Sequence, residues 1–242
     1  MKIDVLAVGA HPDDIELACG GTIAKLVKQG YSVALADVTQ GELGTRGTKE
    51  IRAKEAQKAA EILGVKTRRN LHVPDGNVEV NKRNVQKLIV LIRELKPTMM
   101  IIPHSVERHP DHVNTHHLAK QAWYYAGLRK LKTSLGGSPQ ESFRPHHYFE
   151  FMQWHEFNAS FIVDITDSYD KKMESVRAHT SQFFDPRSKE PPTKLSTPEF
   201  LENIETRAKY YGQRIGVKYG EPFLTNYSLG VSDMFDLIIH KR

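Results

Sequence analysis

The sequence predicts an α/β fold built on a doubly wound, mostly parallel sheet with helices on both faces. Residues 3–8 form an uninterrupted apolar, β-rich run, which is typical of a strand buried on both of its faces. Strand-like and helical patterns then alternate through the first half of the chain, as expected of βα units wound into a parallel sheet. This alternation predicts a Rossmann-like core over residues 1–132. With no repeat or clear linker, we expect one domain over 1–242, in which residues 133–242 add the remaining strands, helices and lid-like loops.

The first half of the chain is expected to supply four strands and three helices. Each helix is followed by a residue that stops it: Gly30 and Gly64 tolerate the left-handed conformation that ends a helix, and Pro97 cannot continue one. Glycines also punctuate the loop 41–47, and a Pro-Asp-Gly-Asn turn occupies 74–77. The expected strands are 3–8, 31–38, 70–73 and 98–102, and the expected helices are 17–29, 48–63 and 81–95.

The second half is less regular, and its last part is expected to form a small irregular extension. Two apolar runs rich in aromatic and β-branched residues predict further strands, and three stretches have helical periodicity. Residues 134–139 are predicted to be a loop. Residues 185–198, with four prolines and mixed charge, are interpreted as a mobile lid. The expected strands are 147–152 and 161–165, and the expected helices are 113–131, 168–183 and 199–215.

Composition excludes several classes of function. Apolar residues make up 39% of the chain and charged residues 26%, as in a protein with an ordinary buried core. The longest apolar runs, such as 98–103, are far too short to span a bilayer, so no membrane partner is expected. The single cysteine, Cys19, excludes an internal disulfide and indicates a cytoplasmic location. The net charge of +5 is not accompanied by a nucleic-acid-binding motif, so no nucleic acid partner is expected.

Polar loops follow three of the predicted strands at the same edge of the sheet. Parallel sheets bind their ligands outside the carboxyl ends of the strands, so these loops, 11–16, 41–47 and 104–112, are where a site is expected. Two of them place imidazole and carboxylate groups side by side. The first reads AHPDDIE from residue 10, and the second reads RHPDH from residue 108.

A metal site accounts best for these two loops. His11 and Asp14 converge if the chain turns between them, as a proline at position 12 favours, and His112 lies at the same sheet edge. Zinc takes three protein ligands of this kind and keeps a fourth position open when it is catalytic. Asp13 would then stand beside the metal as a base. His116, one helical turn beyond His112, is an alternative third ligand.

Plainer interpretations of the same residues also exist. An aspartate at a strand-to-helix junction is more often a helix cap than a metal ligand, and only the pairing of two such loops favours a site. Cys19 is interpreted as a core residue, and Glu16 as a buttress of its loop or a cap of the helix. The other histidines are expected to line or edge the pocket (His104, His146 and His147) or to be structural or exposed (His72, His179 and His240).

The two motifs, with Gly-Gly-Thr at 20–22 behind the first, resemble the LmbE/PIG-L family of zinc-dependent deacetylases. The resemblance extends through Gly-Glu-Leu-Gly at 41–44, Arg52 and Glu55, and covers the first half of the chain best. Within the family, the chain is most similar to the N-acetylglucosaminyl-L-malate deacetylases of bacillithiol biosynthesis. The resemblance implies a zinc ion, or another divalent ion such as Fe²⁺, and three ligands: His11, Asp14 and His112.

The resemblance also implies the remaining roles in the site. Asp13 would be the general base, and His109, oriented by Asp111, would stabilise the oxyanion or transfer a proton. Arg52 and Arg108 would hold the anionic end of the substrate. A tyrosine that helps the oxyanion in some members has no assignable counterpart here.

The activity implied is hydrolysis of the N-acetyl group of a small sugar conjugate, N-acetyl-glucosaminyl-L-malate, by a homo-oligomer (a hexamer or a trimer). One alternative is the same chemistry on N-acetylglucosamine, a chitooligosaccharide or the amide of a thiol conjugate. Another is a non-enzymatic metal- or nucleotide-binding module. The first strand lacks the G-x-G-x-x-G pattern of nucleotide binding, and carboxylates would repel phosphate. Selectivity is expected to depend on loops 41–47, 134–146 and 185–198.

Overall fold

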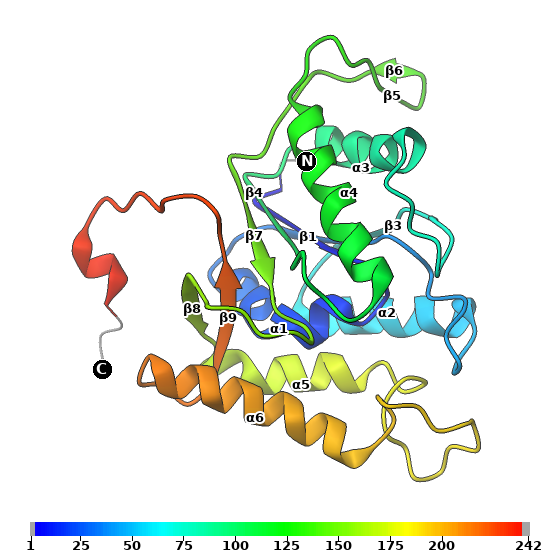
Figure 1. Cartoon of the computed structure of the whole chain (residues 1–242), viewed down its shortest axis with the longest axis vertical. Helices are drawn as coiled ribbons and strands as arrows, with labels where there is room; N and C mark the ends of the chain where they lie inside the picture. Colours follow the sequence, from blue (N-terminus) through cyan, green and yellow to red (C-terminus); the bar gives the residue numbers. More distant parts are fainter. Residues whose placement is uncertain (1–2, 239–242) are drawn as a thin grey trace.

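The computed structural model describes residues 3–238. Its strands β3, β2, β1, β4, β7, β9 and β8 form one seven-stranded sheet, which lies at the centre of the molecule (Figure 1). The strand order is β3-β2-β1-β4-β7-β9-β8. The strands β3, β2, β1, β4 and β7 run parallel to one another. Strand β9 runs antiparallel to both of its neighbours, β7 and β8. The predicted class, a mostly parallel α/β sheet, is confirmed. The strands are β1 (Val5–Gly9), β2 (Val33–Asp37), β3 (Thr67–Asn70), β4 (Met99–Pro103), β7 (His147–Phe151), β8 (Phe161–Asp164) and β9 (Gly220–Leu224).

Helices cover both faces of the sheet because alternate strand residues are apolar on both sides. In β1, Leu6 and Val8 face the cluster built with α3 and α4, whereas Val5 and Ala7 face α1 and α2. Helix α5 packs against α1 and α2, and α6 packs against β9, as Figure 1 shows below the sheet. The helices are α1 (Asp14–Lys28), α2 (Lys49–Leu63), α3 (Lys82–Leu95), α4 (Pro110–Ala126), α5 (Tyr169–Arg177) and α6 (Pro198–Arg214).

The turn from β1 into α1 is tight, and it positions the first motif. A Cβ atom at Gly9 would lie only 3.1 Å from side-chain atoms of Asp14 and Ile15, so the strand and the helix approach each other closely here. The helix stops follow the prediction. Gly64 ends α2 in the left-handed conformation, with φ of 77°, and Gly30 has φ of 92° just beyond α1.

Several predicted boundaries were wrong. The third strand occupies Thr67–Asn70 rather than 70–73, because its arginines are held by acidic partners and give no apolar signal. Helix α5 ends at Arg177, short of 183, and α4 covers 110–126 rather than 113–131. The predicted loop at 134–139 is a small hairpin of β5 (Ser134–Leu135) and β6 (Ser138–Pro139).

Strand β9 was missed altogether. Its sequence, Gly-Glu-Pro-Phe-Leu, contains a charge and a proline, which both argue against a central strand. The charge is tolerated because Glu221 accepts hydrogen bonds from the backbone and side chain of Thr22 and pairs with Lys172. None of the helices in the described part of the chain combines the length and the apolar character that crossing a bilayer requires.

Candidate metal centre and active-site pocket

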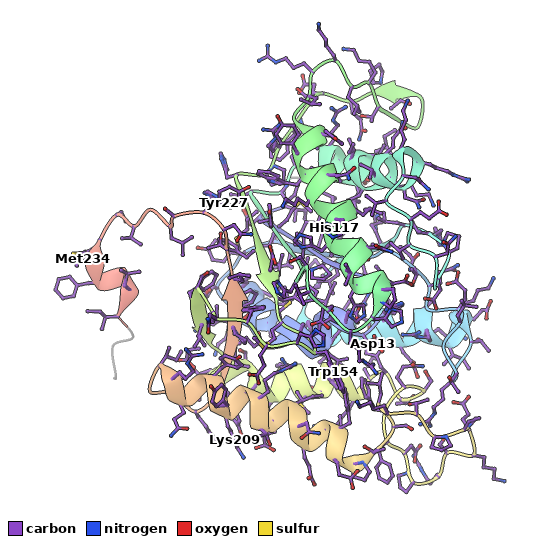
Figure 2. The ribbon with its side chains drawn as sticks, in the orientation of Figure 1. Asp13, His117, Trp154, Lys209, Tyr227 and Met234 are labelled. Carbon is purple, nitrogen blue, oxygen red and sulfur yellow. The ribbon has the colours of Figure 1, made fainter. Side chains whose placement is uncertain are left out.

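A cavity of about 670 Å³ opens at the carboxyl ends of β1 and β4, where the sequence predicts a site. The loops after β1, β2, β3 and β4 supply one wall, and the 153–154 segment and α6 supply the other. Figure 2 labels Asp13 and Trp154, which both line this cavity. Leu195 lines it from the 185–198 segment, whereas the 134–146 loop contributes no lining residue within residues 3–238. The expectation that this loop shapes selectivity finds no support.

His11, Asp14 and His112 converge at the floor of the cavity. Nδ1 of His11 lies 3.3 Å from Nε2 of His112, which in turn lies 3.2 Å from Oδ1 of Asp14. The ligand atoms of the three residues all lie within 4.8 Å of one another. The structure thus brings together the three residues that the sequence suggested as ligands, although one of them lies about a hundred positions from the others.

The donor set and its electrostatics suit a divalent cation. Two imidazole nitrogens and a carboxylate oxygen are ligands that zinc accepts, and ferrous iron accepts them as well. Burial alone would lower the pKa of the His11 imidazole, but Asp111, Asp14 and Asp75 raise it well above its usual value. Burial would raise the pKa of Asp14, yet His112 and His11 hold it well below its ordinary range. The cluster therefore favours positive charge.

Asp14 is held in place by three hydrogen bonds. The backbone amides of Ala10 and His11 donate to Oδ2 at 3.0 and 2.8 Å, and the Gln153 amide donates to Oδ1 at 2.6 Å. Gln153 is fixed in turn by Arg207, whose guanidinium donates to the backbone carbonyl oxygen of Gln153. The Asp14 carboxylate is thus oriented by both walls of the cavity.

Asp13 lies next to this cluster with a strained backbone and a buried side chain. Its φ is 124°, a conformation that side-chain-bearing residues rarely adopt, and strain of this kind gathers at functional sites. Oδ2 lies 3.3 Å from the guanidinium of Arg52. Burial raises the pKa of the Asp13 carboxyl to about 6, with Arg52 opposing this change and Asp14 adding to it.

Arg52, which the resemblance assigns to the anionic end of the substrate, lines the cavity beside Asp13. It is buried, and its guanidinium donates to the carbonyl oxygens of Gly41 and Pro12 at 2.9 and 2.8 Å as well as contacting Asp13. A Cβ atom at Gly41, whose φ is 66°, would lie 1.9 Å from this guanidinium, so a glycine is required there. Arg52 therefore orients the Asp13 loop and also lines the cavity.

His109 and Asp111 depart from expectation in one respect. Nδ1 of His109 accepts a hydrogen bond from the backbone amide of Asp111 at 3.2 Å, so the neutral ring carries its proton on Nε2. The carboxylate of Asp111 instead accepts from the amides of Gly76 and Val78 and lies 3.5 Å from Nε2 of His11. Burial, then His11 and His112, lower the pKa of His109. Asp111 orients His109 through its backbone and His11 through its carboxylate.

Cations gather at the mouth of the cavity. Arg108 lies exposed, with its guanidinium carbon 4.5 Å from the centre of a Trp154 ring, and the Lys194 ammonium lies 4.0 Å from a ring centre of the same side chain. Glu107 fixes the Trp154 loop by accepting its backbone amide at 2.7 Å. The entrance therefore combines an aromatic surface with two positive charges.

The other candidate residues lie outside the cluster. His116 donates a hydrogen bond from Nδ1 to the Pro103 carbonyl oxygen, so it is not an alternative ligand. His104 forms a hydrogen bond of 2.6 Å with the Glu150 carboxylate. Glu16 is fully buried between Arg68 and His179 and buttresses α1. Three further histidines are exposed: His72, His146 and His147. Cys19 lies in the core, and no tyrosine of the described residues lines the cavity. His240 lies outside the described residues.

Sequence reasoning missed Asp75, Glu107 and Gln153. Asp75 had a usable signal, because it follows a predicted strand at the same sheet edge, but its Pro-Asp-Gly-Asn context indicated only a turn. Glu107 lies in the loop 104–112 at the same edge, but nothing local indicated that it would hold the 153–155 backbone about 46 residues away. Gln153 carried no signal of this kind, because its partner Asp14 lies 139 residues away along the chain.

The fold and this cluster define a candidate metal-dependent enzyme of the α/β class. Residues 6–123 match the PIG-L family, described as GlcNAc-PI de-N-acetylase. The diacetylchitobiose deacetylase of Thermococcus kodakarensis is 31% identical over 229 residues, which cover 90% of this chain and 80% of that protein. The chain therefore belongs to the PIG-L/LmbE family of deacetylases.

Other relatives differ in the reaction that their names state. A probable N-acetyl-alpha-D-glucosaminyl L-malate deacetylase 2 of Bacillus cereus is 29% identical, over 75% of this chain and 84% of that protein. A 4-oxalmesaconate hydratase of Pseudomonas putida is 28% identical, over 73% of each chain.

Two solved structures share most of the fold. A conserved protein of Thermus thermophilus superimposes with a TM-score of 0.84 at 36% identity, covering 95% of this chain and 98% of that one. The N,N'-diacetylchitobiose deacetylase of Pyrococcus horikoshii superimposes with a TM-score of 0.76 at 28% identity, covering 91% and 82%.

Proposed function

We propose that this protein is a metal-dependent N-deacetylase that acts on N-acetyl-glucosaminyl-L-malate. The observation that carries the proposal is the convergence of His11, Asp14 and His112 beside the strained, buried Asp13 in one cavity. These three side chains would hold the metal, zinc or ferrous iron. When bound, such an ion lowers the pKa of water and polarises a carbonyl group.

Asp13 is proposed as the general base. It is the carboxylate beside the metal-binding cluster whose own contact is Arg52 rather than a ligand histidine. With a pKa of about 6 it is mostly ionised at neutral pH and can still be protonated during turnover. It accepts the proton that water loses on attacking the acetyl carbonyl, and it returns that proton to the leaving amine nitrogen.

His109 is proposed to stabilise the oxyanion. Since Nδ1 accepts the Asp111 amide, Nε2–H is the group left to donate to the oxygen that becomes negative. A single donor of this kind contributes roughly 3–4 kcal/mol to transition-state stabilisation in acyl transfer. The half-buried ring would act as a neutral donor, in keeping with its lowered pKa.

The entrance supports an anionic conjugate over a neutral one. Arg108 and Lys194 flank Trp154, so a malate carboxylate would meet two cations there while the sugar ring contacts an apolar surface. A neutral chitooligosaccharide could accept hydrogen bonds from these groups but would form no charge-assisted pair with them. We include in the proposal a cytoplasmic location and a homo-oligomeric assembly.

An acetate-release assay on the purified, metal-loaded protein tests the proposal. We expect kcat/KM for N-acetyl-glucosaminyl-L-malate to exceed that for diacetylchitobiose and N-acetylglucosamine by at least about tenfold, the effect of one charged contact. A preference for diacetylchitobiose would overturn the malate assignment and leave deacetylation standing. Hydration of an unsaturated dicarboxylate without any acetate release would overturn deacetylation itself.

A further inference from the structure

The α5–α6 segment, residues 178–197, links two helices without forming a helix or a strand itself. Figure 1 shows it in yellow between the ends of α5 and α6. Connections of this length without secondary structure are uncommon in a compact domain and usually have a function. Most side chains from 184 to 194 are exposed, so no buried core of their own fixes this stretch. Its position must therefore come from contacts with the rest of the protein.

Glu55 of α2 fixes the beginning of the segment. Its buried carboxylate accepts the Thr180 hydroxyl and the Ser181 amide on Oε1, and the Ser181 hydroxyl on Oε2, each at 2.7 Å. Gly47 packs directly against the same place, because a Cβ atom there would lie 2.6 Å from Oγ of Ser181. The segment thus starts from a rigid attachment beside the 41–47 loop.

Arg46 holds the exposed part of the segment. It is only 4% exposed, and its guanidinium donates to Oγ of Ser188 at 2.6 Å and to Oε2 of Glu190 at 3.3 Å. The other oxygen of Glu190 accepts the backbone amide of Gly47 at 3.3 Å. The Gln182 side chain in turn donates to the carbonyl oxygen of Arg46 at 2.8 Å. A buried cation of the 41–47 loop therefore ties down the exposed stretch near its middle.

The Arg46–Glu190 contact limits where Lys194 can lie. Lys194 follows Glu190 closely in the chain, and the connection between them spans at most roughly 14 Å. Its ammonium group lies 4.0 Å from a ring centre of Trp154 at the cavity mouth, and Leu195 beside it lines the cavity. A shift of the segment at Glu190 would therefore move a cation of the entrance.

We propose that Arg46, acting through Glu190, positions Lys194 for the anionic end of the substrate. This inference rests on the proposed function, in which a malate carboxylate meets Lys194. Since Glu190 lies at the surface, its pairing with Arg46 contributes little to the stability of the whole fold. Without it, however, the exposed stretch would lose its main attachment and open locally. The pair thus affects substrate binding rather than folding or the chemical step.

Steady-state kinetics on the malate conjugate tests the positioning role. Glu190→Gln should raise KM about fivefold at unchanged kcat, the factor expected for the loss of one modest polar contact. Asp185→Asn is the matched control, because Asp185 pairs with Arg187 within the same segment, and its variant should behave as the unchanged protein does. In a Lys194→Ala background, Glu190→Gln should have almost no further effect on KM. An undiminished rise in that background, or a fall in kcat at constant KM, overturns the proposal.

Limited proteolysis tests the contact itself, independently of any substrate. Trypsin should cut after Lys194 about fivefold faster in Glu190→Gln than in the unchanged protein or in Asp185→Asn, while the urea midpoints of all three stay the same. Arg46→Gln should accelerate the same cut, and adding Glu190→Gln to it should accelerate it no further. Unchanged cleavage in Glu190→Gln overturns the contact as the attachment of the segment. Absence of acetate release by the unchanged protein instead overturns the proposed function, and the role in substrate binding with it.

Discussion

Nε2 of His11 lies 3.0 Å from Oδ1 of Asp75, although 64 residues separate the two along the chain. Asp75 also accepts the backbone amides of Leu43 and Gly76 at 2.9 Å each, so its own position is fixed. The imidazole therefore donates from Nε2 and presents Nδ1 toward Asp14 and His112. A carboxylate behind a ligand histidine orients the ring and makes it a better ligand.

Asp75→Asn is expected to weaken metal binding by about tenfold, within the 10–100-fold range seen for partners of this kind. The amide keeps the shape of the side chain and removes its charge. Metal affinity is measured by competition with a chromogenic chelator. Asp167→Asn, at an exposed position in a 3₁₀ turn, is the control and should bind as the unchanged protein does. Equal affinities for both variants would show that Asp75 serves only the loop.

The strained backbone at Asp13 predicts that two inactive variants differ in stability. Asp13→Ala and Asp13→Gly both remove the proposed base and the contact to Arg52, but only glycine adopts φ of 124° without steric cost. Both should bind metal and lose nearly all turnover. The free energy of unfolding of the glycine variant should be about 1 kcal/mol higher than that of the alanine variant. This difference is the low end of the usual cost of such backbone strain.

Urea denaturation of the two metal-free variants measures this difference. The matched pair at Gly30, Gly30→Ala against the unchanged protein, calibrates the effect of a positive φ where nothing lies within 4 Å of the added Cβ. If Asp13→Ala proves as stable as Asp13→Gly, position 13 carries no strain. If either variant retains turnover, Asp13 is not the base.

The two arginines are expected to affect different kinetic constants. Arg52 is buried against Asp13, Gly41 and Pro12, so Arg52→Lys should lower kcat by at least about tenfold with little change in KM, because it misplaces the base. Arg108 is at the cavity mouth, so Arg108→Ala should raise KM for the malate conjugate by about tenfold or more and leave kcat nearly unchanged.

Steady-state kinetics on the malate conjugate and on plain N-acetylglucosamine separates these effects. Arg52→Lys should impair both substrates alike, whereas Arg108→Ala should spare the plain sugar. Arg144→Ala is a suitable control, since its guanidinium stacks on Tyr124, whose ring does not line the cavity. Equal losses with both substrates for Arg108→Ala would contradict a role in binding the anion.

Local sequence patterns predicted most of the fold, and their failures have a physical cause. The apolar run at β1 and the glycine after α2 are patterns that depend only on neighbouring residues in the sequence, so both predicted the structure correctly. Strands β3 and β9 were misplaced or missed because their charges are satisfied by distant partners: Arg68 by Asp37 in the neighbouring strand, and Glu221 by Lys172 in α5. Because of such pairing with distant residues, a buried strand can have a polar sequence and is then not predicted as a strand.

The same distinction applies to the site. His11, Asp14 and His112 were predictable because the carboxyl ends of parallel strands meet at one edge. The partner of Arg52 was not predictable, since its contact with Asp13 depends on how closely α2 approaches the β1–α1 turn. The carboxylate of Asp111 likewise turned out to face His11, because the loop after β3 offers it the amides of Gly76 and Val78.

Glu16 predicts how the fold responds to acid. Burial alone would raise the pKa of this carboxyl, but Arg68 and then His179 lower it from 4.5 to about 2. A carboxyl whose pKa is lower in the folded state stabilises the fold above its unfolded pKa, and that contribution disappears as the pH falls. Here it is complete above pH 4.5 and is lost between about 4.5 and 2. The shift corresponds to about 3 kcal/mol at neutral pH.

At pH 7 the free energy of unfolding of Glu16→Gln should therefore be about 3 kcal/mol lower than that of the unchanged protein. This difference between the two proteins should narrow steadily below about pH 4.5. Urea denaturation from pH 7 to pH 3 measures the gap directly. Glu174→Gln removes an exposed pairing with Lys171 and serves as the control, with a difference within about 0.5 kcal/mol at every pH. A gap for Glu16→Gln that stays constant down to pH 3 would mean that lost packing, rather than the charge between Arg68 and His179, accounts for the destabilisation.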